Sequence, residues 1–371
     1  MGSRAEAVAI GDVNNDGRND VLLTTSFNLN SENDYKLFVF LQDANGDLAA
    51  PLRYPTASSY TARAQSIDIG DIDNDGLNEV VLGIEGEGIE IIEQSPTGLV
   101  TPGSFIPTPF SLRVRIADLN NDGLQDVAGI GWGGDEAGVF LQDSSGSLYF
   151  AGAYYAPHGG WDDLALGDVN NDELTDIIVM SGQSFADNLA ILNQDSTGGF
   201  NPVEYYAVGD RILTRGVGVG DVTGDDLADV VVSFGGNKPA SHIAIFSQQL
   251  DGALGAPIIH DSLDIPAQVE VVDVTGDCHA DVVVGHSGWS AFGVYRQDVT
   301  GNLLDEQLYP MPNPALSPHA MALGDFNGDQ SPDIALAASS IDHGLITIEN
   351  ARAFASADDG TCIPVTPPPG C

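Results

Sequence analysis

Near its start the chain reads Asp12-Val13-Asn14-Asn15-Asp16-Gly17-Arg18-Asn19-Asp20, and this nine-residue acidic motif occurs seven times along the 371 residues. The copies follow one another at intervals of 47 to 59 residues. Their first aspartates are Asp12, Asp71, Asp118, Asp168, Asp221, Asp273 and Asp325. A repeat of this length is typical of one blade of a β-propeller. The motif therefore predicts an all-β, seven-bladed propeller.

Side chains that carry oxygen recur at positions 1, 3, 5 and 9 of the motif. Position 3 is Asn14, Asp73, Asn120, Asn170, Thr223, Thr275 and Asn327. Position 5 is Asp16, Asp75, Asp122, Asp172, Asp225, Asp277 and Asp329. Position 9 is Asp20, Glu79, Asp126, Asp176, Asp229, Asp281 and Asp333. Because calcium prefers several hard oxygen ligands, these loops predict up to seven structural Ca²⁺ ions, with positions 1, 3, 5 and 9 as ligands.

The residues around each motif predict strands. An EF-hand loop begins in a similar way but needs a glutamate at position 12 and a helix on each side. Here a β-branched run follows, such as Val230-Val231-Val232. In blade 1 we expect four antiparallel strands, with the acidic loop between the first and the second. Their ranges are 7–10, 20–25, 36–42 and 50–54.

The motif and its flanks resemble the FG-GAP or VCBS repeat, the group that includes the calcium-loop propeller of integrin α subunits. The resemblance covers about residues 5 to 350 and is carried by the runs 11–17, 70–76 and 324–329. It implies a calcium-binding seven-bladed propeller. It implies no particular ligand, because such propellers serve adhesion, lectin activity and polysaccharide-lyase scaffolds.

Position 6 departs from the family pattern in four of the seven copies. Glycine occupies it in blades 1 to 3, whereas blades 4 to 7 carry Glu173, Asp226, Cys278 and Gln330. We expect a positive φ here, which favours glycine. The tightest metal sites are therefore predicted in blades 1 to 3. Blade 6 is the doubtful site, because Cys278 coincides with Thr275 at position 3; its loop could instead be a metal-free turn held by Asx hydrogen bonds.

Composition narrows the class of partner. The formal charge is −42, which disfavours nucleic acid and anionic membranes on Coulomb grounds. No apolar run approaches the roughly 20 residues of a membrane helix. Calcium loops of moderate affinity favour a secreted or cell-surface protein, because calcium is plentiful outside cells. We expect a monomeric propeller, alone or within a larger surface protein.

Residues 1–356 are predicted to form the propeller and residues 357–371 a Cys/Pro-rich tail or linker. The pairing of Cys278, Cys362 and Cys371 stays open at this point. So does ring closure: the outer strand of blade 7 is expected from residues 351–355 or from the N-terminal residues.

The face opposite the acidic loops is the expected ligand face, because the longer loops there carry aromatic residues. The candidate ligand-binding residues are Tyr60, Phe110, Trp132, His158, Trp161, Arg215, Trp289 and His319. Aromatic platforms beside polar groups suit a sugar ring or a protein loop. The alternative is that these aromatics fill gaps between blades. Separately, Asp68 has the register of Arg115 in the next blade, which favours an inter-blade ion pair.

Catalysis has little support in the sequence. No nucleophile elbow, HExxH motif or Cys/His pair of telling spacing is present, and most acidic residues in suggestive positions belong to the metal loops. The sequence thus favours a non-enzymatic extracellular module that binds a glycan or a protein in adhesion. The alternatives are a polysaccharide-active enzyme or its accessory domain, here a lyase or hydrolase, and an architectural spacer of a surface protein.

Overall fold

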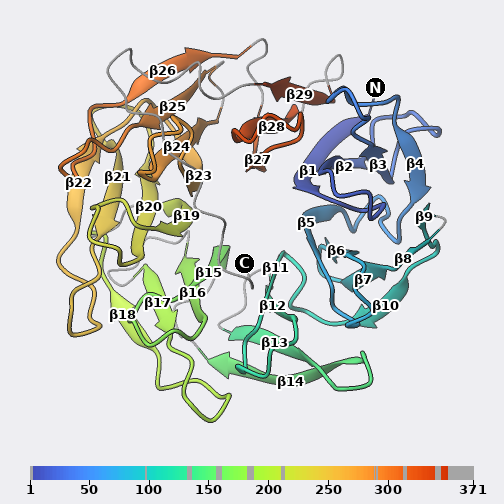
Figure 1. Ribbon diagram of the computed structural model, residues 1–371, viewed down its shortest axis with the longest axis horizontal. Coiled ribbons are helices and arrows are strands. Elements are labelled where there is room, and N and C mark those ends of the chain that lie inside the picture. The colour runs from blue at the N-terminus through green and yellow to red at the C-terminus, as the bar shows by residue number, and fades with distance from the viewer. Residues whose placement is uncertain are drawn as a thin grey trace.

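The computed structural model is an all-β propeller whose blades surround a central axis (Figure 1). Backbone alone is described for residues 161, 162 and 316–320. The described residues are 3–96, 98–131, 136–155, 161–181, 188–209, 214–287, 289, 291–311, 316–338 and 344–349. Within them, no helix is long and apolar enough to cross a bilayer.

Each blade is an antiparallel sheet whose strands follow chain order from the axis outward. The inner strands are β1 (Arg4–Gly11), β5 (Ala64–Gly70), β11 (Arg113–Ala117), β15 (Trp161–Gly167), β19 (Thr214–Gly220), β23 (Pro266–Val272) and β27 (Leu316–Gly324). The second strands are β2 (Asp20–Ser26), β6 (Glu79–Ile84), β12 (Asp126–Ile130), β16 (Asp176–Ser181), β20 (Asp229–Gly235), β24 (Asp281–His286) and β28 (Asp333–Ala338).

The third strands are β3 (Lys36–Phe40), β7 (Gly88–Ile92), β13 (Glu136–Gln142), β17 (Leu189–Leu192), β21 (Ser241–Phe246), β25 (Ala291–Tyr295) and β29 (Leu345–Ile348). The outer strands are β4 (Leu52–Pro55), β10 (Ser104–Pro107), β14 (Leu148–Tyr155), β18 (Glu204–Tyr206), β22 (Ile258–Asp261) and β26 (Gln307–Pro310). A short hairpin, β8 (Gln94–Ser95) and β9 (Gly98–Leu99), precedes β10. The predicted fold class, blade count and strand order are confirmed.

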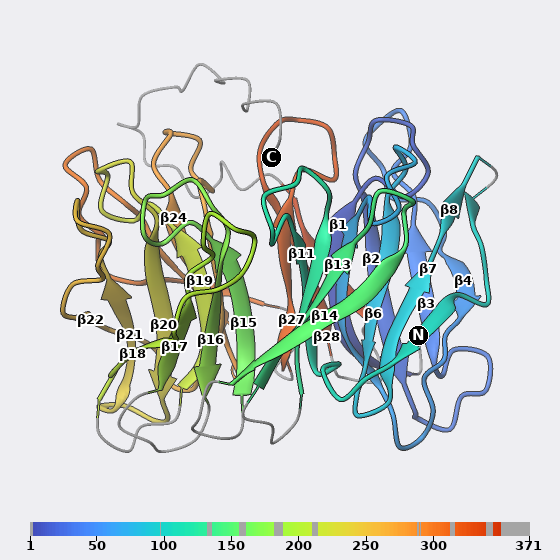
Figure 2. The same cartoon turned by 90° about the horizontal axis from the view of Figure 1, so that it is seen from below.

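Burial explains the sequence pattern of the strands. Every residue of the second strands β2, β6 and β16 is buried, since blades pack against both faces and strands flank both edges. The sequences of such strands are continuous apolar runs. The outer strands β4, β22 and β26 are mostly exposed. Figure 2 shows the strands running between the two faces of the disc.

The core is divided among the interfaces between neighbouring blades. Seven hydrophobic clusters occupy the seven interfaces, from blades 1 and 2 to blades 6 and 7. The seventh cluster joins Leu23 and Phe38 of blade 1 to Phe326 and Ala335 of blade 7. Apolar packing therefore closes the ring.

This closure settles part of the question about blade 7. Residues 4–11 form the inner strand β1 of blade 1, so the expectation that the N-terminus could supply the outer strand of blade 7 is wrong. Three described strands make up blade 7. Residues 351–355, the tail 357–371, Cys362 and Cys371 lie outside the described residues, so the predicted division at residue 356 stays a prediction.

Candidate functional site

The acidic loops join the inner strand to the second strand in all seven blades, as predicted. Their backbone turns through the left-handed region twice. Position 6 has a φ between 65° and 85° in every copy, including the non-glycine residues Glu173, Asp226, Cys278 and Gln330. The expectation of a positive φ at this position is confirmed. Position 4 also has positive φ and is always Asn or Gly, for example Asn15 and Gly224.

The position 1 aspartate organises each loop. Its Oδ2 accepts a hydrogen bond from the position 6 backbone N–H at 2.8 to 3.0 Å in all seven copies. Its Oδ1 accepts the N–H of position 5 in six copies, as Asp12 does from Asp16 at 3.3 Å. The loop thus keeps its shape through Asx-type bonds, whatever else its oxygens bind.

The position 9 carboxylate lies deeper than its neighbours. One of its oxygens accepts the position 2 N–H at 2.9 to 3.2 Å in every loop. In blades 1 to 6 the other accepts the N–H of a glutamine just after or at the end of the third strand, such as Gln142 at 2.7 Å from Asp126. This anchoring role was missed, although the glutamine recurs in the sequence.

Burial, with repulsion from nearby loop carboxylates, raises the pKa of the position 9 acids. The pKa rises to about 6 for Asp20, Asp126 and Asp229. It rises to about 7 for Glu79, Asp176 and Asp281. Burial thus disfavours the charged form of these carboxylates, which a bound cation would favour again. In the blade 1 loop, Arg18 forms an ion pair with another loop carboxylate, Asp16.

Blade 2 is the one loop with a carboxylate at position 3, Asp73. Ligand oxygens of Asp71, Asp73 and Glu79 lie within 4.8 Å of one another, the only such acidic group among the described residues. In blade 6, Cys278 is disulfide-bonded to a partner outside the described residues. Metal binding by the 28 predicted ligands stays a prediction.

Blades 1 to 6 each hold the acidic loop of the blade before them through a side-chain amide, which in blade 2 is Asn78, donating to Asp12 O at 2.9 Å. The side-chain amide of Gln142 in blade 3 donates to the position 1 carbonyl of Asp71 in blade 2 at 3.3 Å. Equivalent bonds join blades 4 to 6 to the loops before them. Asn19 closes the circle by donating to Asp325 O of blade 7 at 3.0 Å. Loop geometry and ring assembly are therefore coupled.

The candidate ligand residues whose side chains are described differ in exposure. Tyr60 is 71% exposed and Trp289 is 45% exposed, as expected for a binding face. Arg215 is half-buried on β19. Phe110 is only 8% exposed and stacks on Phe150 at 5.9 Å, so its expected exposure is wrong and it fills the core between blades 2 and 3.

The side chains of four candidate ligand residues are not described. Trp132 and His158 lie outside the described residues, and for Trp161 and His319 the backbone alone is described, in β15 and β27. The predicted ion pair between Asp68 and Arg115 is not among the described ion pairs. Arg113 instead pairs with Asp163 of blade 4, at 3.7 Å.

A groove on blade 1 adds residues that the sequence analysis missed. It has a volume of about 590 Å³ and lies along the loop between β2 and β3. Phe27 stacks on Tyr35 at 6.3 Å and meets Tyr60 edge-on at 5.1 Å. Leu29 is 86% exposed. The signal that could have revealed this site is the length of this loop together with its aromatic residues.

The groove is held in shape by a buried carboxylate. Asp34 accepts hydrogen bonds from Ser3 Oγ at 2.6 Å and from the backbone N–H of Asn28 and Asn30 at 3.0 and 2.9 Å. Leu29 and Tyr35 have φ of 61° and 56°, a conformation that such residues rarely adopt. The loop is thus fixed in an unusual conformation that exposes apolar side chains.

Known structures share this architecture at low identity. A lectin from Agrocybe aegerita, solved for its recognition of non-reducing terminal N-acetylglucosamine, has a TM-score of 0.56 and 16% identity, covering 84% of this chain and 81% of its own. BBS1N, solved in complex with ARL6DN, has a TM-score of 0.61 and 13% identity, covering 94% and 92%. A protein from Lactobacillus plantarum has a TM-score of 0.59 and 15% identity, covering 84% and 86%.

At such identities these likenesses show the shared fold alone. A comparison with curated protein sequences found no significant match. The FG-GAP-like repeat, in contrast, matches residues 12–82, 118–179, 168–232 and 242–336, which together exceed half of the chain. The matched segments include all seven acidic motifs. The chain therefore belongs to the FG-GAP-like repeat family.

Proposed function

We propose that the protein is an extracellular recognition module that binds a glycan or a protein ligand in adhesion and is stabilised by calcium. The observation that carries this proposal is the groove on blade 1, where Phe27 and Tyr35 lie beside polar side chains and Tyr60 contacts Phe27 from outside the lining. Aromatic rings beside solvent-exposed polar groups are suited to bind sugar rings and protein loops.

The composition of the groove supports a polar ligand with apolar faces. Asp34, Lys36 and Thr56 line it together with Phe27 and Leu29. Its volume of about 590 Å³ lies within the range of roughly 300 to 1,000 Å³ that is common for small-ligand sites. Because Asp34 already orders the loop, binding would lose little conformational entropy.

The fold comparison is consistent with glycan recognition. The Agrocybe aegerita lectin, with a TM-score of 0.56, recognises non-reducing terminal N-acetylglucosamine. This supports the capacity of such a scaffold to present a sugar site. At 16% identity it says nothing about which sugar this chain would bind.

Calcium would be held by the residues at positions 1, 3, 5 and 9 of each loop. Two observations support the fit: the close grouping of Asp71, Asp73 and Glu79, and the raised pKa of the buried position 9 acids. A bound ion would supply positive charge that offsets the repulsion between these carboxylates. Reliance on calcium favours an extracellular location, and we propose no catalytic role.

A glycan array probed in calcium buffer tests the ligand face. Phe27→Ala and Tyr60→Ala should each weaken binding about ten-fold, since an aromatic contact contributes up to about 1.5 kcal/mol. Tyr149→Ala is the matched control, because Tyr149 is an exposed ring on β14 outside the groove. Binding to no glycan, or equal binding by all three variants and wild type, would overturn the assignment of a glycan to this groove.

A further inference from the structure

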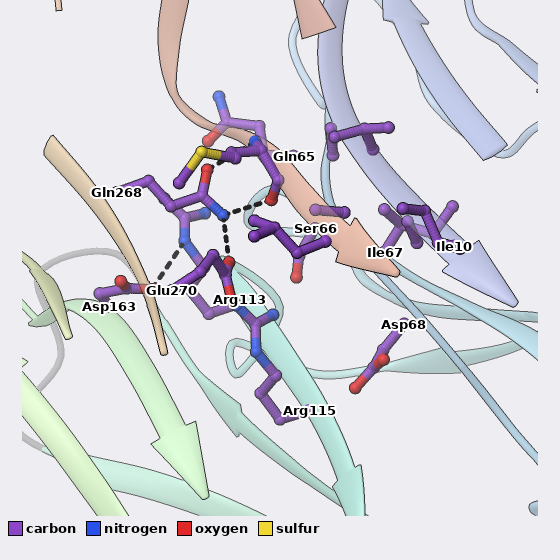
Figure 3. Close-up of a pocket in the computed structure, with 16 residues that line it drawn as sticks. Ile10, Gln65, Ser66, Ile67, Asp68, Arg113, Arg115, Asp163, Gln268 and Glu270 are labelled. Carbon is purple, nitrogen blue, oxygen red and sulfur yellow. Dashed lines mark hydrogen bonds and ion pairs between the residues drawn. The ribbon is translucent and has the colours of Figure 1, made fainter. Parts of the chain in front are cut away.

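The axial channel carries a cluster of charged side chains on the inner strands (Figure 3). Asp68 comes from β5, Arg113 and Arg115 from β11, Asp163 from β15 and Glu270 from β23. They line two cavities of about 210 and 280 Å³. Arg115, Asp163, Gln268 and Glu270 line both cavities and so mark the place where the two adjoin.

Several of these charges are satisfied within the protein. Arg113 Nε lies 3.7 Å from Asp163 Oδ1, and Asp163 Oδ2 accepts the N–H of Val217 at 3.1 Å. Asp68 accepts the N–H of Ile69 at 3.0 Å and of Ile116 at 2.8 Å. These bonds link blades 2 to 5, and they leave Asp68 and Asp163 with both oxygens engaged.

Glu270 and Arg115 keep open hydrogen-bonding capacity. Glu270 Oε1 accepts from Gln268 Nε2 at 2.8 Å, and its other oxygen has no partner among the described residues. Arg115 donates from NH1 to Val114 O at 2.9 Å, and its remaining donors have no described partner. The two charges attract each other, yet no ion pair within 4.0 Å joins them in the described part of the chain. Arg115 and Glu270 thus lie on the cavity wall as opposite charges that do not contact each other.

Aliphatic residues also line the first cavity. Ile10 of β1 and Leu323 of β27 are half-buried beside it, whereas Val8 and Met321 are buried in the core between blades. Among the side chains that the structure describes, no aromatic ring lines either cavity, so these residues offer no stacking platform for a sugar ring. The first cavity is therefore mostly polar, with a smaller aliphatic part at Ile10 and Leu323.

We propose that this channel binds a small zwitterion, an α-amino acid with an aliphatic side chain. Arg115 holds its carboxylate, Glu270 holds its ammonium group, and Ile10 and Leu323 contact its side chain. The bond to each charge is strengthened by the enclosed setting. Both cavities are smaller than the roughly 300 Å³ of common ligand sites, so a monomeric ligand fits better than a polymer.

Charge considerations disfavour other ligands. A free anion would be repelled by a chain of formal charge −42, whereas a zwitterion carries no net charge. A calcium ion needs six to eight oxygens, while Glu270 offers one open oxygen beside the positive Arg115. The pKa of Glu270, raised to about 7 mainly by burial, agrees with a carboxylate that lacks a close cation.

Isothermal titration of the calcium-loaded full chain with L-leucine tests this proposal. Wild type should bind saturably, while 3-methylbutylamine and 4-methylpentanoate, which each lack one of the two charges, should bind at least about ten-fold more weakly. This comparison needs no variant, so it does not depend on how substitutions affect folding.

Variants then identify the two residues. Glu270→Gln and Arg115→Gln should each weaken leucine binding about ten-fold, and Glu136→Gln, at an exposed position of β13, should not. The proposal is overturned if wild type shows no saturable binding up to about 10 mM leucine. It is equally overturned if the single-charge analogues bind as well as leucine, or if folded Glu270→Gln and Arg115→Gln proteins bind like wild type.

Discussion

Replacing Gly146 by alanine, compared with a control glycine, should separate the cost of left-handed backbone from the cost of a steric clash at the contact between blades 2 and 3. Gly146 lies in the turn between β13 and β14, with a φ of 79°. An added Cβ would lie well under 3.0 Å from the carbonyl oxygen of Asp73, in the acidic loop of blade 2. Gly86, between β6 and β7, is the matched control, because its φ is 72° and nothing lies within 4 Å of an added Cβ.

The expected magnitudes follow from these two environments. Left-handed backbone costs a non-glycine residue roughly 1–2 kcal/mol, and the lower entropy of the unfolded chain returns about 0.4–1 kcal/mol. Gly86→Ala should therefore reduce the free energy of unfolding by about 1 kcal/mol. Gly146→Ala adds a clash with backbone, and such overpacking costs about 1–3 kcal/mol more.

Urea unfolding at a fixed calcium concentration measures the free energy of unfolding of each variant. The two values can be compared if the slope of this free energy with urea concentration is the same for both proteins. The free energies of unfolding of the two variants should differ by about 1–3 kcal/mol. If they agree within about 0.5 kcal/mol, the contact between the Gly146 turn and the Asp73 loop does not constrain the assembly, and the coupling between loops and blades is refuted.

The remaining predictions concern charge. Calcium should raise the thermal unfolding midpoint above that in EDTA and equal magnesium should not; an unchanged midpoint would mean that the acidic loops are plain turns. Asp73→Asn should reduce the calcium-induced rise, and Asp47→Asn, at an exposed turn, should leave it intact. The pKa of Glu270 is raised to about 7, so the native state binds an extra proton between about pH 4.5 and 7, and stability should fall as pH rises through this window. Glu270→Gln should remove that part of the pH dependence, and equal slopes for the two proteins would contradict it.

The candidate site was only partly predictable. The acidic loops and the positive φ at position 6 follow from a local pattern of nine residues, and both are found where expected. The groove on blade 1 was missed, and only Tyr60, which contacts its Phe27, was predicted, because the exposure of Phe27 depends on how Asp34 folds its loop. Phe110 was misjudged for a related reason: the sequence shows an aromatic residue before a strand, but only packing against Phe150 shows that it is buried.

The sequence by itself determined the fold class, the number of blades, the strand order and the place of the acidic loops. All of these depend on interactions between residues close in the chain, and the same local pattern occurs in seven copies. Tertiary structure alone decided how blade 1 meets blade 7, where Asn19 reaches Asp325 across 306 residues. It also decided that Arg115 and Glu270 face one channel from β11 and β23. Such pairs carry no local signal, because their distance in the sequence is set by the curvature of the whole ring and not by the pattern of any one blade.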